Sequence, residues 1–252
     1  MRLEGKKAIV TGGAGGIGRA SSLALAAEGA AVAVVDLNAD AAEAVAAEIR
    51  TAGGSAFAVA ADVSAEADIE RVVATAMSEF GSIDIVFNNA GIIRRTTAVE
   101  TTVEEWDRVF GVNVRAIFLM CKHVVPLMAA AGGGSIINTG SGWGLKGGGQ
   151  AISYCASKGA VVNMTRALAI DHGPQGIRVN TVNPGDVDTG MLRDEARQLG
   201  QAESGFLSEA ADRPLQRMGQ PHEIASVVVW LASEESSYIT GAAIVADGGG
   251  IA

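Results

Sequence analysis

A glycine-rich segment between an apolar run and an amphipathic one constrains this chain more than any other feature. Residues 8–11 form a short apolar run, and Thr11-Gly12-Gly13-Ala14-Gly15-Gly16-Ile17-Gly18 leads from it directly into a helical pattern. Glycines let the backbone turn sharply and approach a pyrophosphate, and the following helix N-terminus offers free N–H groups and a positive dipole end. The strand–turn–helix order therefore predicts a dinucleotide-binding fold.

A phosphate-binding loop of an NTP-binding switch is the alternative interpretation of the same glycines. Gly13 and Gly18 have the required separation, but Arg19-Ala20 stands where Lys followed by Ser or Thr is needed. The hydroxyl that would hold Mg²⁺ is therefore missing, which disfavours the switch. Gly12, Gly16 and Gly18 instead follow the spacing T-G-x-x-x-G-x-G.

The rest of the chain alternates short apolar runs with longer amphipathic segments. Strands are expected at residues 8–11, 31–36, 55–60, 84–88, 135–139, 178–182 and 243–246, and helices at 17–28, 39–52, 66–80, 103–130, 153–171 and 221–232. Because the strands are near-continuous apolar runs, we predict an α/β protein with a parallel sheet covered on both faces. We expect one doubly wound Rossmann domain over residues 1–252, with the irregular stretch 186–215 as a substrate lid.

Asp36 ends the second expected strand, 18 residues after Gly18. A carboxylate there can accept hydrogen bonds from both hydroxyls of an adenosine ribose, and it repels a 2′-phosphate. No Lys or Arg lies between Asp36 and Glu48 to pair with such a phosphate. The sequence therefore favours NAD over NADP.

A tyrosine and a lysine lie four residues apart at the start of the helix expected at 153–171. This spacing brings the Tyr154 phenol and the Lys158 ammonium to one helical face. The neighbouring cation is expected to lower the pKa of the phenol, with help from the positive nicotinamide ring of bound NAD⁺. Ser141 follows the strand at 135–139, and Asn113 lies within the helix at 103–130.

Taken together, these motifs resemble the short-chain dehydrogenase/reductase family, in its form of roughly 250 residues. The matching segments run nearly end to end: TGGAGGIG at Thr11, Asp62-Val63, NNAG at Asn88, Asn113, Ser141, YCASK at Tyr154, Asn183-Pro184-Gly185, Thr240-Gly241, and Asp247-Gly248-Gly249. Departures are Asp186, where the family usually has an apolar or aromatic residue, and Ala246, which replaces a common Val. The family's activity would be hydride transfer between a nicotinamide cofactor and a secondary alcohol or ketone.

The resemblance implies a set of residues that hold the cofactor. They are Gly12, Gly16, Ile17 and Gly18 at the pyrophosphate, Asp36 at the ribose, Asp62 and Val63 at the adenine, Asn89 and Ala90 along the cleft, Tyr154 and Lys158 at the nicotinamide ribose, Val187 and Thr189 at the carboxamide, and Pro184 and Gly185 beside them. Gly15 occupies a position where NADP-preferring members often carry a basic residue, which again favours NAD.

The resemblance also implies the catalytic roles. Tyr154 takes the hydroxyl proton as hydride leaves carbon, Ser141 steadies the oxygen, and Asn113 anchors a water that relays protons outward. Lys158 assists Tyr154. Family members are commonly tetramers that bury the helices at 103–130 and 153–171, so a homotetramer is expected.

Substrate residues are less strongly indicated by the sequence. Arg94 and Arg95 follow NNAG-Ile92-Ile93 at the end of a strand, where α/β proteins bind ligands. Solvated loop arginines are the plainer interpretation. Candidate pocket residues are Arg94, Trp143, Gln150, Asp186 and Met191. They indicate a polar pocket, for a small-molecule substrate such as a polyol or a sugar acid.

Charge and composition exclude several other classes. The chain has 28 acidic and 19 basic residues, for a net charge of −9, which disfavours nucleic acid and anionic membranes as partners. Only Cys121 and Cys155 are present, no apolar run is long enough for a membrane span, and the N-terminus lacks a signal-peptide core, so a cytoplasmic location is expected. His123, His172 and His222 are too far apart to predict a metal site.

Two further functions remain as alternatives. A non-catalytic dinucleotide sensor would have the same fold, although intact Ser141, Tyr154 and Lys158 argue against the loss of chemistry. A reductase of a hydrophobic ketone, such as a steroid or an acyl thioester, would share the same catalytic residues.

Overall fold

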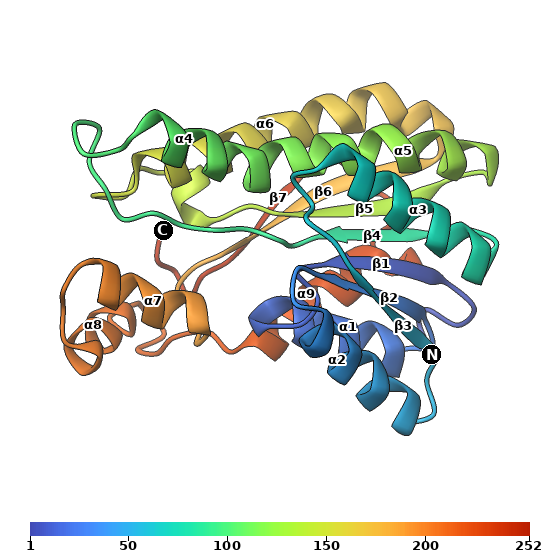
Figure 1. Cartoon of the computed structure of the whole chain (residues 1–252), viewed down its shortest axis with the longest axis horizontal. Helices are drawn as coiled ribbons and strands as arrows, with labels where there is room; N and C mark the ends of the chain where they lie inside the picture. Colours follow the sequence, from blue (N-terminus) through green and yellow to red (C-terminus); the bar gives the residue numbers. More distant parts are fainter.

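Seven parallel strands form one sheet at the centre of the protein (Figure 1). The computed structural model describes residues 1–252. The strands are β1 (Lys7–Thr11), β2 (Ala31–Asp36), β3 (Ala56–Ala60), β4 (Ile85–Asn88), β5 (Gly134–Thr139), β6 (Ile177–Pro184) and β7 (Ala243–Ala246). Their spatial order is β3-β2-β1-β4-β5-β6-β7, so the chain reverses direction across the sheet between β1 and β4. Such a reversal opens a crevice at the carboxyl ends of the two strands, where α/β proteins bind ligands.

Helices cover both faces of the sheet, as the sequence predicts. One layer contains α1 (Gly16–Ala27), α2 (Ala39–Thr51) and α9 (Pro221–Ala232). The other contains α3 (Glu66–Phe80), α4 (Val103–Phe110), α5 (Ala116–Ala130) and α6 (Ile152–His172). Figure 1 shows these two layers below and above the sheet. Each layer packs on its own apolar core, because central strands such as β1 and β2 bury side chains on both faces.

The helix expected at 103–130 is continuous but not uniform. A π-helical turn, Gly111–Arg115, separates α4 from α5. By length and composition the whole helix, Val103–Ala130, could cross a membrane, but half of its most apolar window is buried in the protein. Buried core helices commonly meet the same criterion, and this helix contributes to the core that covers the sheet.

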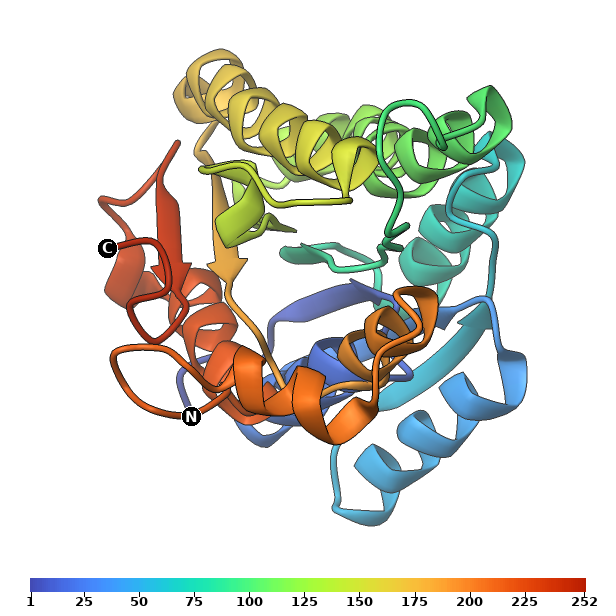
Figure 2. The same ribbon diagram turned by 90° about the vertical axis from the view of Figure 1, so that its left-hand side faces the viewer.

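Residues 186–215 differ from the sequence-based expectation. We expected the least regular stretch of the chain, and the structure instead contains α7 (Gly190–Gln198) and α8 (Glu203–Ala210) there. The charged composition of α7, which buries only three side chains, hides its helical pattern, and α8 is only eight residues long. Both helices lie beyond the carboxyl ends of the strands, as Figures 1 and 2 show from two directions.

Several contacts hold this excursion together. Val187 and Gly219 form an isolated parallel bridge, so the segment leaves the body and returns to it at one point. At its start, the Arg193 guanidinium lies 2.6 Å from the Asp188 carboxylate and 3.3 Å from that of Glu203 on α8. The segment is therefore an ordered flap over the carboxyl edge of the sheet.

Candidate active site

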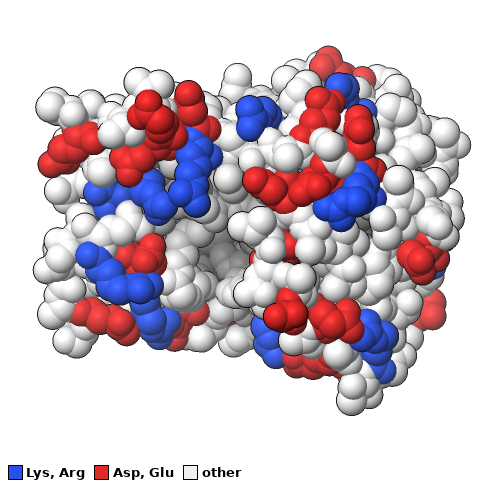
Figure 3. Space-filling view, viewed as in Figure 1, with Lys and Arg blue, Asp and Glu red and all other residues white.

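One cavity of about 430 Å³ lies between the carboxyl edge of the sheet and the flap. Its walls come from the loops that follow β1, β2, β4, β5 and β6 and from α7. Figure 3 shows a hollow in the face of the molecule between these parts, with acidic and basic side chains interspersed around it. The position agrees with the crevice that the strand order predicts.

The glycine-rich turn forms one end of this cavity. A Cβ on Gly18 would lie 1.9 Å from the Gly12 carbonyl oxygen, and one on Gly12 would lie 2.9 Å from the Ala90 Cα. The Thr11 hydroxyl accepts hydrogen bonds from the backbone N–H groups of Asn89 (3.0 Å) and Ala90 (3.2 Å). The turn after β1 is therefore held directly against the loop after β4, and only glycine fits at its closest approaches.

The first turn of α1 suits a bound anion. Gly15 is the N-cap and has no side chain to bond the first N–H groups, which lack partners within a helix. Gly16 has φ +49°, and a Cβ there would approach the Thr189 side chain to 3.1 Å. The open N–H groups lie beneath the start of the flap, and this arrangement fits a pyrophosphate.

Substituting Gly18 by alanine is expected to damage this turn. The added methyl group overlaps a backbone carbonyl, so the turn must move, at a cost of about 2 kcal/mol in the free energy of unfolding. Binding of a dinucleotide should be lost with it. Thermal unfolding and titration with NADH measure both effects. Gly205→Ala is the control, because Gly205 is also helical and nothing lies within 4 Å of its Cβ position; equal stability of the two variants would contradict the prediction.

Asp36 lies at the end of β2, on the rim of the same cavity. Its carboxylate accepts hydrogen bonds from the backbone N–H groups of Ala14 (3.1 Å) and Asn38 (3.1 Å). These bonds orient the carboxylate beside the glycine turn. About half of its acceptor positions stay available, since a carboxylate has about four.

The residues expected at the adenine lie outside this cavity. Asp62 is exposed and accepts hydrogen bonds from the N–H and hydroxyl groups of Ser64, at 2.9 and 2.7 Å. Val63 is buried in the core behind the sheet edge. Of the remaining cofactor residues, Gly18 is enclosed beneath the turn, and the others line the cavity: Gly12, Gly16, Ile17, Asn89, Ala90, Tyr154, Lys158, Pro184, Gly185, Val187 and Thr189.

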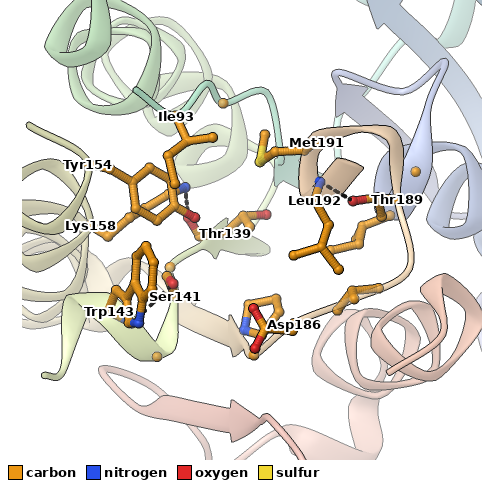
Figure 4. A pocket seen from close by; sticks show the side chains of 18 of the residues that line it. Ile93, Thr139, Ser141, Trp143, Tyr154, Lys158, Asp186, Thr189, Met191 and Leu192 are labelled. Atoms are coloured by element: carbon orange, nitrogen blue, oxygen red, sulfur yellow. Dashed lines mark hydrogen bonds between the residues drawn. The ribbon is translucent and has the colours of Figure 1, made fainter. Parts of the chain in front are cut away.

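Ser141, Tyr154 and Lys158 line one wall of the cavity (Figure 4). The Lys158 Nζ is buried, donates a hydrogen bond to the Thr139 carbonyl (2.7 Å) and lies 5.6 Å from the centre of the Tyr154 ring. Ser141 projects from the loop after β5, where its hydroxyl accepts a hydrogen bond from the Trp143 N–H (3.1 Å). Helix α6 and the end of β5 thus bring a phenol, an amine and a hydroxyl together.

Burial changes the acid–base properties of this group. It raises the pKa of Tyr154, an effect that hydrogen bonding with Ser141 partly offsets, and it lowers the pKa of Lys158 to about 8. The lowering of the phenol pKa that we expected from Lys158 and the nicotinamide ring of bound NAD⁺ stays a prediction for the complex with the cofactor. Removing a phenolate from water costs more than the surrounding groups return.

The wild-type chain is expected to gain stability relative to Lys158→Met as the pH rises from about 8 to about 10.5. In that range the folded chain has released the Lys158 proton, whereas the unfolded chain still binds it, so stability rises with pH. Melting temperatures of both proteins, measured in steps across this range, test the difference. Lys6→Met removes a surface amine and should follow the wild type in parallel. Parallel curves for Lys158→Met would contradict the prediction.

Asn113 lies in the π-helical turn, fully buried and behind the cavity wall. Its side chain accepts a hydrogen bond from the Ile92 N–H (2.8 Å) and donates to the Ile92 carbonyl (2.9 Å) and the Ser157 hydroxyl (2.9 Å). π-Helical turns widen a helix locally and are frequent at functional sites. Here the turn points Asn113 between α6 and the loop after β4.

The substrate end of the cavity contains some of the expected residues and several that were missed. Trp143, Asp186 and Met191 line it; Arg94 and Gln150 do not. Arg94 bonds the neighbouring Ile93 carbonyl (3.1 Å), and Gln150 is exposed. The lining side chains that sequence reasoning missed include Ile93, Lys146, Leu192, Glu195, Arg213 and Ile251. Leu192, Glu195 and Arg213 lie in the flap, whose helices gave no clear periodic signal.

Three side chains outside this cavity form a group that could hold a metal ion. Glu66, Glu70 and His123 place their ligand atoms within 4.8 Å of one another, which the spacing of the histidines did not predict. Both glutamates are exposed, and Lys122 already pairs with Glu66 (2.5 Å). The group joins α3 to α5 on the surface and is remote from the cavity.

The chain is similar to known proteins over nearly its whole length. A family model described as "Enoyl-(Acyl carrier protein) reductase" matches residues 12–250. An uncharacterised oxidoreductase, YxbG of Bacillus subtilis (strain 168), is 42% identical over 98% of this chain and 92% of its own length. D-Threitol dehydrogenase of Mycolicibacterium smegmatis is 41% identical over 99% of this chain and 94% of its own length.

A solved structure of similar fold supports the same relationship. The crystal structure of levodione reductase superposes with a TM-score of 0.95 at 36% identity, covering 98% of each chain. The similarity therefore includes the sheet, both helical layers and the flap region.

Proposed function

The chain belongs to the short-chain dehydrogenase/reductase family and is an oxidoreductase of secondary alcohols and ketones, and we propose that NAD is its cofactor and a polar alcohol its substrate. One observation carries this proposal: Ser141, Tyr154 and Lys158 line the same cavity as the glycine turn and Asp36. A reacting carbon placed at Tyr154 would thus lie within reach of a dinucleotide bound at the turn.

The roles of the chain's residues follow from their positions. In the oxidation direction, Tyr154 takes the proton of the substrate hydroxyl, and Ser141 donates a hydrogen bond to the same oxygen. The Lys158 ammonium uses one donor on Thr139 and keeps two for ribose hydroxyls and for stabilising the phenolate. The expected role of Asn113, to anchor a water that carries the proton outward, stays a prediction, because its side-chain donors are used on Ile92 and Ser157. Bound NAD⁺ supplies the hydride acceptor and a positive charge beside the phenol.

The cofactor preference rests on Asp36. Its carboxylate lies on the cavity rim next to the glycine turn, where an adenosine ribose would be, and no basic side chain follows it in α2 before Arg50. Gly15 adds no cation on the other side. Asp36 therefore accepts two ribose hydroxyls and repels a 2′-phosphate.

The substrate class rests on the mixed character of the far end of the cavity. Glu195, Asp186 and Arg213 supply polar groups among apolar residues, which suits a secondary alcohol with further polar groups, such as a polyol or a sugar acid. One relative is named for its action on D-threitol, a polyol.

Absorbance of NADH formed from a panel of polyols, sugar acids, hydroxysteroids and simple secondary alcohols tests the proposal, with NAD⁺ and NADP⁺ side by side. Oxidation that requires NAD⁺ and a polar alcohol supports it. Oxidation with NADP⁺ alone would overturn the cofactor assignment. NADH binding without turnover on any substrate would favour a dinucleotide sensor.

A second candidate is a reductase of a hydrophobic ketone, such as a steroid or an acyl thioester. The apolar side chains Ile93, Met191 and Leu192 favour it, because they line the cavity opposite or beside Tyr154 (Figure 4). NADH consumption with an acetoacetyl thioester, together with no NADH formation from polyols and NAD⁺, would support this candidate instead.

We also propose a cytoplasmic homotetramer. Phe118 on α5 and Ile170 on α6 expose 53% and 76% of their surface, and burying such apolar groups between subunits is favourable. Cys121 and Cys155 are both unpaired, as is usual in a reducing compartment. Light scattering is expected to give the mass of four chains; the mass of one chain would dismiss the assembly.

A further inference from the structure

A buried carboxylate in the flap has no part in the proposed chemistry. Glu195 lies on α7 and lines the cavity, with only 11% of its side chain exposed. Its neighbours on the same wall include Met191 and Leu192, which lie across the cavity from Tyr154 (Figure 4). Burial raises the pKa of Glu195, so its charge needs a partner to persist.

Arg95, from the loop after β4, supplies this partner and fixes its direction. Its Nη1 lies 2.7 Å from the Glu195 Oε2, and its side chain is only 10% exposed. The guanidinium lies 5.0 Å from the centre of the Trp143 ring, and Trp143 in turn meets Tyr154 edge to face at 6.2 Å. A buried ion pair is commonly no more stable than apolar side chains of the same volume, so stability alone does not account for it.

Only one oxygen of the Glu195 carboxylate is used within the chain. Oε2 accepts the hydrogen bond from Arg95. Oε1 accepts no hydrogen bond from the chain, and it is not fully enclosed by it. Oε1 is therefore an accessible acceptor on a residue that lines the cavity. A carboxylate oxygen can only accept, so its ligand must be a donor such as a hydroxyl.

Both arginines near Glu195 are already paired. Arg213 pairs with Asp186, and Arg95 pairs with Glu195. A substrate carboxylate beside Glu195 would meet the free carboxylate oxygen without a free arginine to balance it. Lys146, which also lines the cavity, directs its Nζ to the Gly250 carbonyl. The negative charges of Glu195 and Asp186 both raise the pKa of the Tyr154 phenol. The two carboxylates are therefore close enough to influence the proposed reacting position.

We propose that Glu195, held in place by Arg95, accepts a hydrogen bond from a second hydroxyl of the substrate and so selects neutral diols and polyols over monofunctional alcohols and hydroxy acids. Glu195 is the specificity-determining residue, and Arg95 is a positioning residue. The inference rests on the proposed function of the same cavity.

The test compares three substrates that share a ring. They are cyclohexanol, trans-cyclohexane-1,2-diol and 2-hydroxycyclohexanecarboxylate, each with NAD⁺ and the full chain. Because Glu195→Leu alone would leave Arg95 buried and unpaired, the variant is the double substitution Arg95→Met with Glu195→Leu, which removes both charges. Glu209→Leu, which removes an exposed and unpaired carboxylate of α8, is the control.

The wild type and the control should favour the diol over cyclohexanol by at least about tenfold in kcat/KM, the effect of one hydrogen bond to a charged group. In the double variant this ratio should approach unity, mainly through a higher KM for the diol. An unchanged ratio, or a wild-type preference for the carboxylate, would overturn the inference.

A separate measurement distinguishes failure of this inference from failure of the proposed function. If none of the three substrates yields NADH, the proposed function fails for these alcohols, and calorimetric titration of the NAD⁺ complex with the diol then decides the inference independently. Saturable binding that the double variant loses supports it. Binding that both proteins share, or that neither shows, overturns it.

Discussion

Replacing Tyr154 by phenylalanine should reduce kcat by about a thousandfold or more, because it removes from the cavity wall the hydroxyl that accepts the proton in the proposed mechanism. The ring itself would remain, so its packing against Trp143 and the shape of the cavity should persist. NADH binding should change little. The loss therefore belongs in the chemical step and not in affinity for the cofactor.

The second tyrosine of the chain provides a matched control for this substitution. Tyr238 is fully exposed, and Tyr238→Phe removes the same hydroxyl from a position outside the cavity. Steady-state NADH formation and a separate titration with NADH should show full activity for this control. Turnover by Tyr154→Phe within tenfold of the wild type would remove Tyr154 from the role of acid and base.

Burial explains why the phenol depends on its surroundings for activation. In the chain alone, desolvation raises the pKa of Tyr154, and the charges of Glu195 and Asp186 add to this effect. Lys158 carries a pKa of only about 8, so it is partly neutral at mildly alkaline pH. The positive nicotinamide ring of bound NAD⁺ would favour the phenolate. Tyr154 would then lose its proton mainly in the complex that can react.

The regular part of the fold was predictable because each element carries its own local signal. The strand at 31–36 and the helices at 66–80 and 221–232 occur with the predicted bounds. Buried parallel strands must be apolar on both faces, and Pro221 marks the first turn of its helix. The glycine turn was equally clear, since its spacing reflects contacts within and beside one strand–helix unit.

The parts that the sequence did not reveal depend on contacts between distant residues. Arg95 meets Glu195 a hundred positions away, and Arg94, its neighbour, bonds only the adjacent carbonyl. No local pattern distinguishes two consecutive arginines. Likewise, the π-helical turn that carries Asn113 leaves no periodic signature in the sequence, and it becomes visible only through the bonds to Ile92 and Ser157.

The cofactor preference should depend on one carboxylate, and Asp36→Asn is expected to change the ratio of NAD⁺ to NADP⁺ efficiency by about a hundredfold. The variant keeps the size of the side chain, and its one amide oxygen can accept from either the Ala14 or the Asn38 N–H, which bond different oxygens of the carboxylate. It loses the charge-assisted bonds to the ribose hydroxyls, each worth about tenfold or more, and it loses the repulsion of a 2′-phosphate.

Steady-state kcat/KM values with both cofactors and one alcohol measure this ratio. The wild type should favour NAD⁺ strongly, and the variant should weaken with NAD⁺ while it improves with NADP⁺. Asp40→Asn is the control, because Asp40 is exposed in the first turn of α2 and lies outside the cavity. If kcat/KM with NADP⁺ rises in Asp36→Asn and not in Asp40→Asn, the discrimination between the cofactors is due to the charge at the ribose. A wild type indifferent to the 2′-phosphate would show that Asp36 lies away from the bound cofactor, and the adenosine would then have to bind elsewhere along the rim.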